Sequence, residues 1–148
     1  MTEQTGPRLV GVNHVALEVG NIEEALAFYG RIFTFELRGR SEKAAFIDMG
    51  DQFLALMEGR SQGADGKRHF GLVVDDRSRV RDLAKAAGAV MLDGPFLDFL
   101  DPWGNRIEVV EYRDVQFSKT ASVLLAMRLD LDKSEKAREE LRAKGIAL

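Results

Sequence analysis

The chain has 148 residues, enough for one domain with a substantial core and too few for two independent ones. Its net charge is −3, with 21 Lys and Arg interspersed among 24 Asp and Glu, so the sequence has no basic stripe that would bind nucleic acid. The absence of cysteine excludes disulfides and thiolate chemistry. No apolar run is long enough to span a membrane, and the first ten residues lack the layout of a signal peptide, so we expect a cytoplasmic protein.

The first half of the chain reads as one strand, one helix and three strands. Residues 9–19 alternate apolar and polar side chains around His14, which predicts a strand. Asn21 predicts a helix N-cap, with Glu24 three residues on as its capping-box partner, and the helical stripe ends near Ile32. The three strands expected after this helix cover residues 34–40, 44–49 and 53–58.

The same order of elements returns after the glycine-rich loop at residues 59–68. Residues 68–74 predict a strand that contains His69, the second of only two histidines. Asp75 or Asp76 is expected to cap the following helix, and Gly88 to stop it. Three further strands are expected at residues 89–92, 95–100 and 106–112. The repeat predicts two βαβββ modules, at about residues 9–58 and 68–112.

Residues 114–148 differ in character and predict a helical C-terminal extension. We expect a short apolar helix at residues 119–127 and a polar helix at residues 132–144 with Asp132 as its N-cap. The apolar stripe of the second helix is thin. This helix is therefore either a polar outer layer of the domain or a strap onto a partner subunit.

Two histidines and one glutamate have the composition of a metal site. Glu108 lies on the last predicted strand among apolar neighbours, where an acidic side chain either points to water or holds something positive. A single strand histidine is more often a hydrogen-bonded core residue than a ligand. The matched positions of His14 and His69 in the two modules favour a metal site with Glu108 as third ligand. Imidazole and carboxylate ligands are compatible with Fe, Mn, Zn, Ni or Co.

Three stretches resemble the vicinal oxygen chelate superfamily, which includes glyoxalase I, methylmalonyl-CoA epimerase, fosfomycin-resistance thiol transferases, bleomycin-resistance proteins and extradiol dioxygenases. They are VNHVALEV, RHFGLVVDD and, most specifically, DPWGNRIEVVEY. The resemblance implies an α+β fold in which paired βαβββ modules form a half-open curved sheet around a central cup. It places this domain at residues 1–113, outside the helical tail, and makes His14, His69 and Glu108 the metal ligands. Family members are often dimers, which implies a homodimer.

One position departs from the lyase and isomerase branch of that family. Glyoxalase I and the epimerase carry a fourth ligand on the fourth strand, whereas the repeat places Ala55 there. Glu58 falls on the opposite face of an ideal strand and could reach the metal only through a bulge. Extradiol dioxygenases, in turn, add active-site histidines, and this chain has no others. Each subfamily therefore matches in part.

The leading hypothesis is a divalent-metal-dependent enzyme of the glyoxalase or dioxygenase type that acts on a small oxygen-rich substrate chelated to the metal. We expect a lyase or isomerase rather than a dioxygenase. Without a spare histidine, Glu108 and Tyr112, which alternation places on one face, are the candidate catalytic residues. Glu111 is expected to face away. The alternative is a non-catalytic protein that binds or sequesters a small molecule, as in the bleomycin-resistance branch. Neither hypothesis includes a nucleic-acid or membrane partner.

Overall fold

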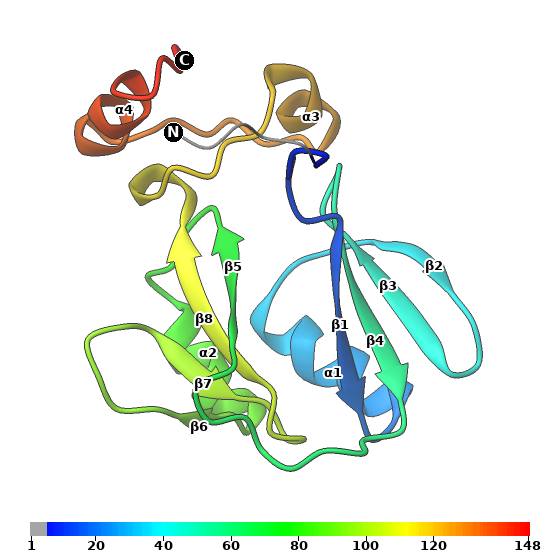
Figure 1. Ribbon diagram of the computed structural model, residues 1–148. Helices are drawn as coiled ribbons and strands as arrows, with labels where there is room; N and C mark the ends of the chain where they lie inside the picture. Colours follow the sequence, from blue (N-terminus) through cyan, green and yellow to red (C-terminus); the bar gives the residue numbers. More distant parts are fainter. Residues whose placement is uncertain (1–5) are drawn as a thin grey trace.

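The computed structural model describes residues 6–148 and shows two four-stranded sheets that each carry one helix (Figure 1). The first module consists of β1 (His14–Val19), α1 (Ile22–Ile32), β2 (Leu37–Arg40), β3 (Ala44–Asp48) and β4 (Phe53–Glu58). The second consists of β5 (Phe70–Val74), α2 (Val80–Ala87), β6 (Val90–Met91), β7 (Asp98–Leu100) and β8 (Arg106–Glu111). The strand orders β1-β4-β3-β2 and β5-β8-β7-β6 are equivalent, so the predicted α+β fold of two βαβββ modules is confirmed.

The helices join the two modules. α1 contacts α2 directly, and a single cluster of buried side chains runs from one module into the other. Phe28 of α1 belongs to this cluster, and its ring centre lies 6.3 Å from that of Phe99 in β7 and 6.4 Å from that of Trp103. Both helices lie behind the strands in Figure 1, and the front of each sheet carries no helix. Among residues 6–148, no hydrogen-bonded strand pair joins the two sheets.

Local signals placed most elements correctly. Asn21 caps α1 by accepting a hydrogen bond from the Glu24 backbone, as expected, and Gly88 ends α2 with a positive φ of 97°. The first strand is shorter than predicted because His14 pairs with Phe53, and the chain before Phe53 turns at Gly50, whose φ is 80°. Residues 9–13 therefore have no strand opposite them.

Two predicted helix caps are wrong. The α2 N-cap is Arg79, because the Asp76 carboxylate accepts a hydrogen bond from the Ser78 backbone in the turn before the helix. The last helix, α4 (Glu135–Arg142), is capped by Ser134, whose side chain accepts from the Ala137 backbone. Asp132 instead accepts from the Lys133 backbone and pairs with Arg138.

The tail packs across both modules of its own chain. After the short η1 helix (Tyr112–Asp114), α3 (Ala121–Ala126) reaches the β3–β4 turn, where a Cβ on Gly50 would lie 2.6 Å from the Met127 sulfur. The Lys119 ammonium donates to the Met49 carbonyl at 2.7 Å. The tail then runs back from α3 toward the end of β8, above which α4 lies (Figure 1). No helix of residues 6–148 is long and apolar enough to cross a membrane.

Candidate metal centre

Strand alternation gives each sheet a helix-facing side and an open side. In β1, Leu17 and Val19 are buried toward the helix, with exposed fractions of 6% and 0%. The side chains that alternate with them along the strand consequently lie on the open side: His14, Ala16 and Glu18. In β8, Ile107 and Val109 are fully buried, so Glu108 also lies on the open side, with Arg106 and Val110.

The strands on both sides of Glu108 leave it accessible. Its neighbour on β5 is Gly71, where an added Cβ would meet nothing within 4 Å. Its neighbour on β7 is Asp98, which is only 5% exposed and is held by the Arg106 guanidinium at 2.6 Å. The Arg106 charge compensates the Asp98 carboxylate, so Glu108 is the carboxylate that is left to face the open side.

The His14 ring is held in place by its two neighbours Asn13 and Phe53. Its Nδ1 lies 2.8 Å from the Asn13 side-chain oxygen, and its ring stacks on Phe53 at 4.6 Å with planes 9° apart. An acceptor on Nδ1 places the proton there and leaves Nε2 with a free lone pair. His14 is exposed in the single chain.

His69 has the same arrangement in the second module. It lies one residue before β5, and its Nδ1 is 2.8 Å from the Lys67 carbonyl oxygen. The acceptor again sets the tautomer and frees Nε2. The two histidines therefore occupy equivalent positions in the two modules, and each has Nδ1 beside an acceptor oxygen.

A single chain does not bring the three predicted ligands together. Within residues 6–148, no group of three or more His, Cys, Asp or Glu side chains lies close enough to hold a metal ion. The reason is topological: His14 belongs to the first sheet, His69 and Glu108 belong to the second, and the modules meet through α1 and α2.

The remaining candidates have other partners in the chain. Glu58 accepts a hydrogen bond from the Ile22 backbone at 3.4 Å, at the start of α1, and the β1–β4 register has no bulge that would turn it round. Glu111 faces away from Glu108, as expected, and accepts from the Arg77 backbone. Tyr112 is 5% exposed, and its hydroxyl accepts from the Lys119 backbone at 3.2 Å.

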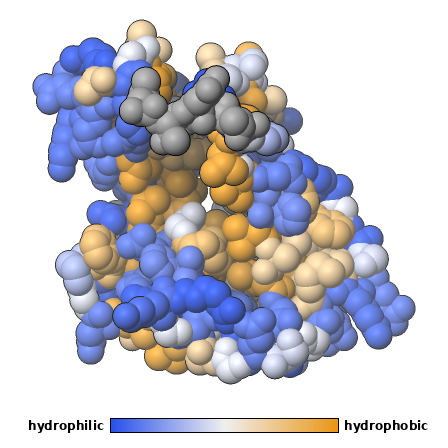
Figure 2. Space-filling model, viewed as in Figure 1, coloured by the Kyte–Doolittle hydropathy of each residue, from blue (hydrophilic) through white to orange (hydrophobic). Residues whose placement is uncertain are grey.

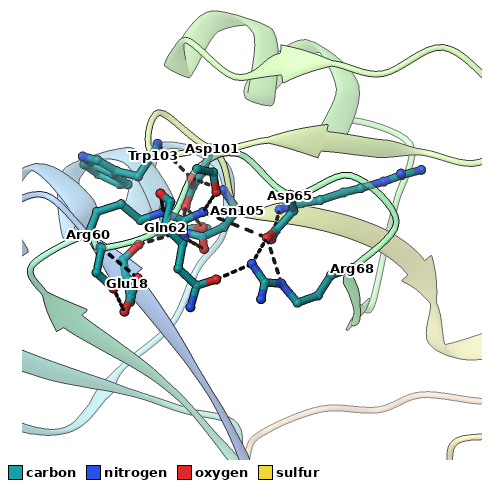
Figure 3. Close-up of polar contacts among 12 residues, drawn as sticks. Glu18, Arg60, Gln62, Asp65, Arg68, Asp101, Trp103 and Asn105 are labelled. Atoms are coloured by element: carbon teal, nitrogen blue, oxygen red, sulfur yellow. Dashed lines mark hydrogen bonds and ion pairs between the residues drawn. The ribbon is translucent and has the colours of Figure 1, made fainter.

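The DPWGN turn has a structural role that sequence reasoning missed. Asp101 is 2% exposed and accepts hydrogen bonds from the Tyr29 hydroxyl, the Asn105 side chain and the Trp103 and Asn105 backbone (Figure 3). Asn105 in turn donates to the Glu18 carbonyl and accepts from Arg60. The turn thus ties the end of the second sheet to both α1 and β1.

The loop that connects the modules is held by the same network. Asp65 accepts from Arg68 and from the Arg106 backbone, and Ser61 donates its hydroxyl to Glu18 at 2.7 Å (Figure 3). The hydrogen bonds from Ser61 lower the pKa of Glu18. The glycine-rich sequence of residues 59–68 predicted only a boundary between the two halves, and the contacts of Arg60, Asp65 and Arg68 that fix this loop were missed.

A family model matches most of the chain. The model described as the glyoxalase/bleomycin resistance protein/dioxygenase superfamily covers residues 11–109, both modules together. The chain belongs to this superfamily. The glyoxalase-type match ends at residue 109 and leaves the tail outside it.

Solved structures of the superfamily share the fold at low sequence identity. The fosfomycin resistance protein FosX from Listeria monocytogenes, complexed with Mn(II) and sulfate, is 21% identical, with a TM-score of 0.60 over 82% of this chain and 99% of that one. FosX from Mesorhizobium loti is 18% identical, with a TM-score of 0.59 over 80% and 99%. A glyoxalase-related enzyme from Fulvimarina pelagi is 21% identical, with a TM-score of 0.58 over 70% and 88%. At these identities the likeness concerns the fold alone.

Proposed function

We propose that this protein is a divalent-metal-dependent enzyme of the glyoxalase type that acts on a small oxygen-rich molecule. The metal site is formed between two copies of the chain, by His14 of one copy and by the partner's His69 and the partner's Glu108. The observation that carries the proposal is the matched state of the two histidines. Each has Nδ1 held 2.8 Å from an acceptor oxygen, which leaves Nε2 as the nitrogen with a lone pair for a metal.

The open faces of the sheets explain why two copies are needed. On the side of the sheets without a helix, Figure 2 shows apolar patches interrupted by polar residues, and this side faces solvent in the single chain. A face-to-face dimer with two-fold symmetry covers these surfaces by placing the first module of one copy over the second module of the other. Both sites of such a dimer then have the same three ligands, and the cup lies between the sheets.

The bound metal and Glu108 have different proposed roles in the reaction. A bound divalent cation would polarise neighbouring substrate oxygens and stabilise negative charge that develops on them. Glu108 is the carboxylate within reach of a substrate proton, because Asp98 beside it is neutralised by Arg106. The lack of a further histidine favours a lyase or isomerase over a dioxygenase.

We also propose Tyr112 as a second proton carrier. Its hydroxyl accepts a hydrogen bond from the Lys119 backbone and keeps its own proton to donate. Tyr112→Phe removes that proton while leaving the buried ring in place, so a catalytic role predicts loss of turnover with unchanged metal content. A fall in melting temperature with activity retained would make Tyr112 an anchor of the tail only.

The fold likeness adds support from the known proteins. FosX from Listeria monocytogenes has been solved with Mn(II) and, in a mutant, with Mn(II) and 1S,2S-dihydroxypropylphosphonic acid. Mn(II) is accordingly the first metal to test, followed by Zn, Fe, Ni and Co, which the same ligands accept.

Metal content tests the proposal directly. Elemental analysis of protein purified without a polyhistidine tag and then dialysed against Mn(II) should find one metal per chain. His14→Ala, His69→Ala and Glu108→Gln should each abolish binding. Glu111→Gln is the matched control, because this carboxylate lies on the same strand and faces the other side. Unchanged metal content in the three ligand variants would refute the site.

A non-catalytic binding protein is the second candidate. The absence of a complete ligand group within residues 6–148 of one chain favours it over the enzyme if the chain is a monomer in solution. Light scattering at two concentrations separates the candidates. A metal-free monomer supports the binder, and a metal-loaded dimer supports the enzyme.

A further inference from the structure

The turn between β3 and β4 supports the backbone that leads into His14. The Gln52 side chain of this turn donates to the Val12 carbonyl at 2.9 Å. The backbone N–H of the next residue, Phe53, donates to the Asn13 carbonyl at 3.2 Å. Both acceptors immediately precede His14 in the chain, so the place of this turn sets the place of the His14 backbone.

The same turn also holds the His14 ring. The Phe53 ring stacks on it at 4.6 Å, and the other face of Phe53 is covered by the Arg38 guanidinium, 4.7 Å from the ring centre. Arg38 in turn donates to the carbonyls of Gly50 and Gln52, at 2.9 and 3.1 Å. The turn, the guanidinium and the two rings are therefore packed as one unit, and a displacement of the turn would displace His14.

A lysine of the tail holds this turn from the outside. The Lys119 ammonium donates to the Met49 carbonyl at 2.7 Å and pairs with the Asp51 carboxylate. The Lys119 side chain is only 8% exposed. Burying an ammonium costs free energy unless polar partners compensate it, and here a carboxylate and a carbonyl do so. The contact is thus a specific one between the tail and the turn.

Lys119 reaches the strand of Glu108 as well. Its backbone N–H donates to the hydroxyl of Tyr112, which directly follows β8. One tail residue therefore contacts the end of β8 through its main chain and the β3–β4 turn through its side chain. Figure 1 shows the tail crossing between these two places, at the opposite end of β8 from the turn that contains Asp101.

We infer that Lys119 is a positioning residue for the metal centre, which acts through the β3–β4 turn to hold His14 in the tautomer and orientation that bind the metal. The inference rests on the proposed function, because the orientation of His14 affects metal binding only if this ring is a ligand. It gives a role to the tail, which lies beyond the residues that the family model matches.

The two histidines of the chain allow the effect to be read without metal. Long-range proton–nitrogen NMR of the metal-free chain, with isotope-labelled histidine and neutral rings, reports which ring nitrogen carries the proton. In the wild type both rings should have a protonated Nδ1 and a bare Nε2, because each Nδ1 has an acceptor oxygen at 2.8 Å. Lys119→Met should shift His14 toward the other tautomer. It should leave His69, whose acceptor is the Lys67 carbonyl, unchanged.

Metal affinity is the second measurement. Lys119→Met should weaken Mn(II) binding about tenfold, the lower end of the loss expected when a group that orients a ligating histidine is removed. Asp51→Asn keeps the ammonium and removes the charge of its carboxylate partner, so it should cause both changes to a smaller extent. If Lys119→Met does not fold, Asp51→Asn decides the question.

Two control variants separate positioning from general stability. Lys144→Met removes an exposed ammonium of the same tail that has no ion pair within residues 6–148. Tyr29→Phe removes a buried hydrogen bond at the other end of β8. Both variants should leave the tautomer of His14 unchanged.

Three results would overturn the inference. The first is an unchanged His14 tautomer in Lys119→Met and in Asp51→Asn. The second is an equal change in both histidines, which would make Lys119 a contributor to general stability. The third is a changed His14 tautomer with unchanged Mn(II) affinity. A wild-type chain that binds no Mn(II) would instead refute the proposed function itself, whatever the His14 signals show.

Discussion

The phenol of Tyr29 donates a 2.6 Å hydrogen bond to the carboxylate of Asp101, and this contact joins α1 of the first module to the turn before β8 of the second. Both residues are almost fully buried. Burial, and then the charge of Asp101, raises the pKa of Tyr29 well above its ordinary value, so the phenol remains a donor. This bond is one of the contacts that fix the relative placement of the two sheets, together with the buried cluster between α1 and α2.

Removing the Tyr29 hydroxyl should therefore weaken the whole fold. Tyr29→Phe keeps the buried ring but deprives a buried carboxylate of one donor, which costs about 1–3 kcal/mol of unfolding free energy. Urea unfolding at pH 7 measures the loss. Equal stability of the wild type and Tyr29→Phe would mean that the Asn105 and backbone donors suffice for Asp101.

Gly104 should tolerate no side chain. Its φ is 89°, and a Cβ there would lie 2.7 Å from the Ala64 backbone. Gly104→Ala combines a strained conformation with a clash against main chain, so we expect a loss of at least 1–3 kcal/mol, roughly the cost of one such strained residue. Gly66→Ala is the control, because no atom lies within 4 Å of its added Cβ. Thermal melts of both variants should differ clearly. Similar melts would contradict the close approach of the connecting loop to this turn.

Lys133 should hold the tail in place. Its ammonium donates to the carbonyls of Tyr112, Val115 and Phe117 and lies 3.6 Å from the centre of the Tyr112 ring. Burial lowers the pKa of Lys133 to about 8. Lys133→Met leaves three carbonyls without this donor, so amide exchange in residues 119–142 should accelerate by about tenfold or more, equivalent to roughly 1–3 kcal/mol.

The exposed Lys136 provides the control for the tail. Lys136→Met removes an ammonium from the same region that has no partner of this kind within residues 6–148. It should leave the exchange rates unchanged. Equal rates in Lys133→Met and the wild type would show that the tail is held by its apolar contacts alone.

Asp65 should contribute to stability against acid. Burial would raise the pKa of Asp65, but the hydrogen bonds from Arg68 and the Arg106 backbone outweigh it and hold the pKa below its ordinary value. Because the folded pKa is lower than the unfolded one, this stabilisation is complete above a pH of about 4 and is lost as the pH falls through the folded value.

Replacing Asp65 should therefore flatten the acid limb of the stability curve. Asp65→Asn should lower the free energy of unfolding at pH 7. Between about pH 4 and pH 2, the free energy of unfolding should then fall less in this variant than in the wild type. Asp93→Asn, at an exposed carboxylate with no hydrogen bond within residues 6–148, should leave the curve unchanged. Parallel acid limbs in the wild type and Asp65→Asn would contradict the lowered pKa.

Local patterns were sufficient to predict the elements of this fold. The Asn21 cap depends on a hydrogen bond to the backbone of Glu24, only three residues later. The alternation in residues 53–58 predicted the bounds of β4 as the structure has them. The caps at Asp76 and Asp132 were wrong because each carboxylate has a competing partner nearby, Ser78 in one case and Arg138 in the other. Sequence spacing does not rank such competing local bonds.

The candidate site was predictable in its parts and not in its assembly. Strand alternation placed Glu108 on the open side and Glu111 on the other, and the structure agrees. What brings ligands together is the packing of modules, which depends on contacts such as Tyr29 with Asp101 that are 72 residues apart. No short motif predicts a contact between residues so far apart in the chain. The same sequence is therefore compatible with a site within one chain and with a site between two chains.

Complementation between two inactive variants tests the central claim most directly. His14→Ala and Glu108→Gln chains, each with a different peptide tag, are co-expressed, and the mixed dimer is isolated by two affinity steps. Each variant alone should hold no Mn(II). In the mixed dimer one site has lost both His14 and Glu108, and the other has all three ligands. The account therefore predicts one Mn(II) per mixed dimer, and a mixed dimer without metal would contradict it.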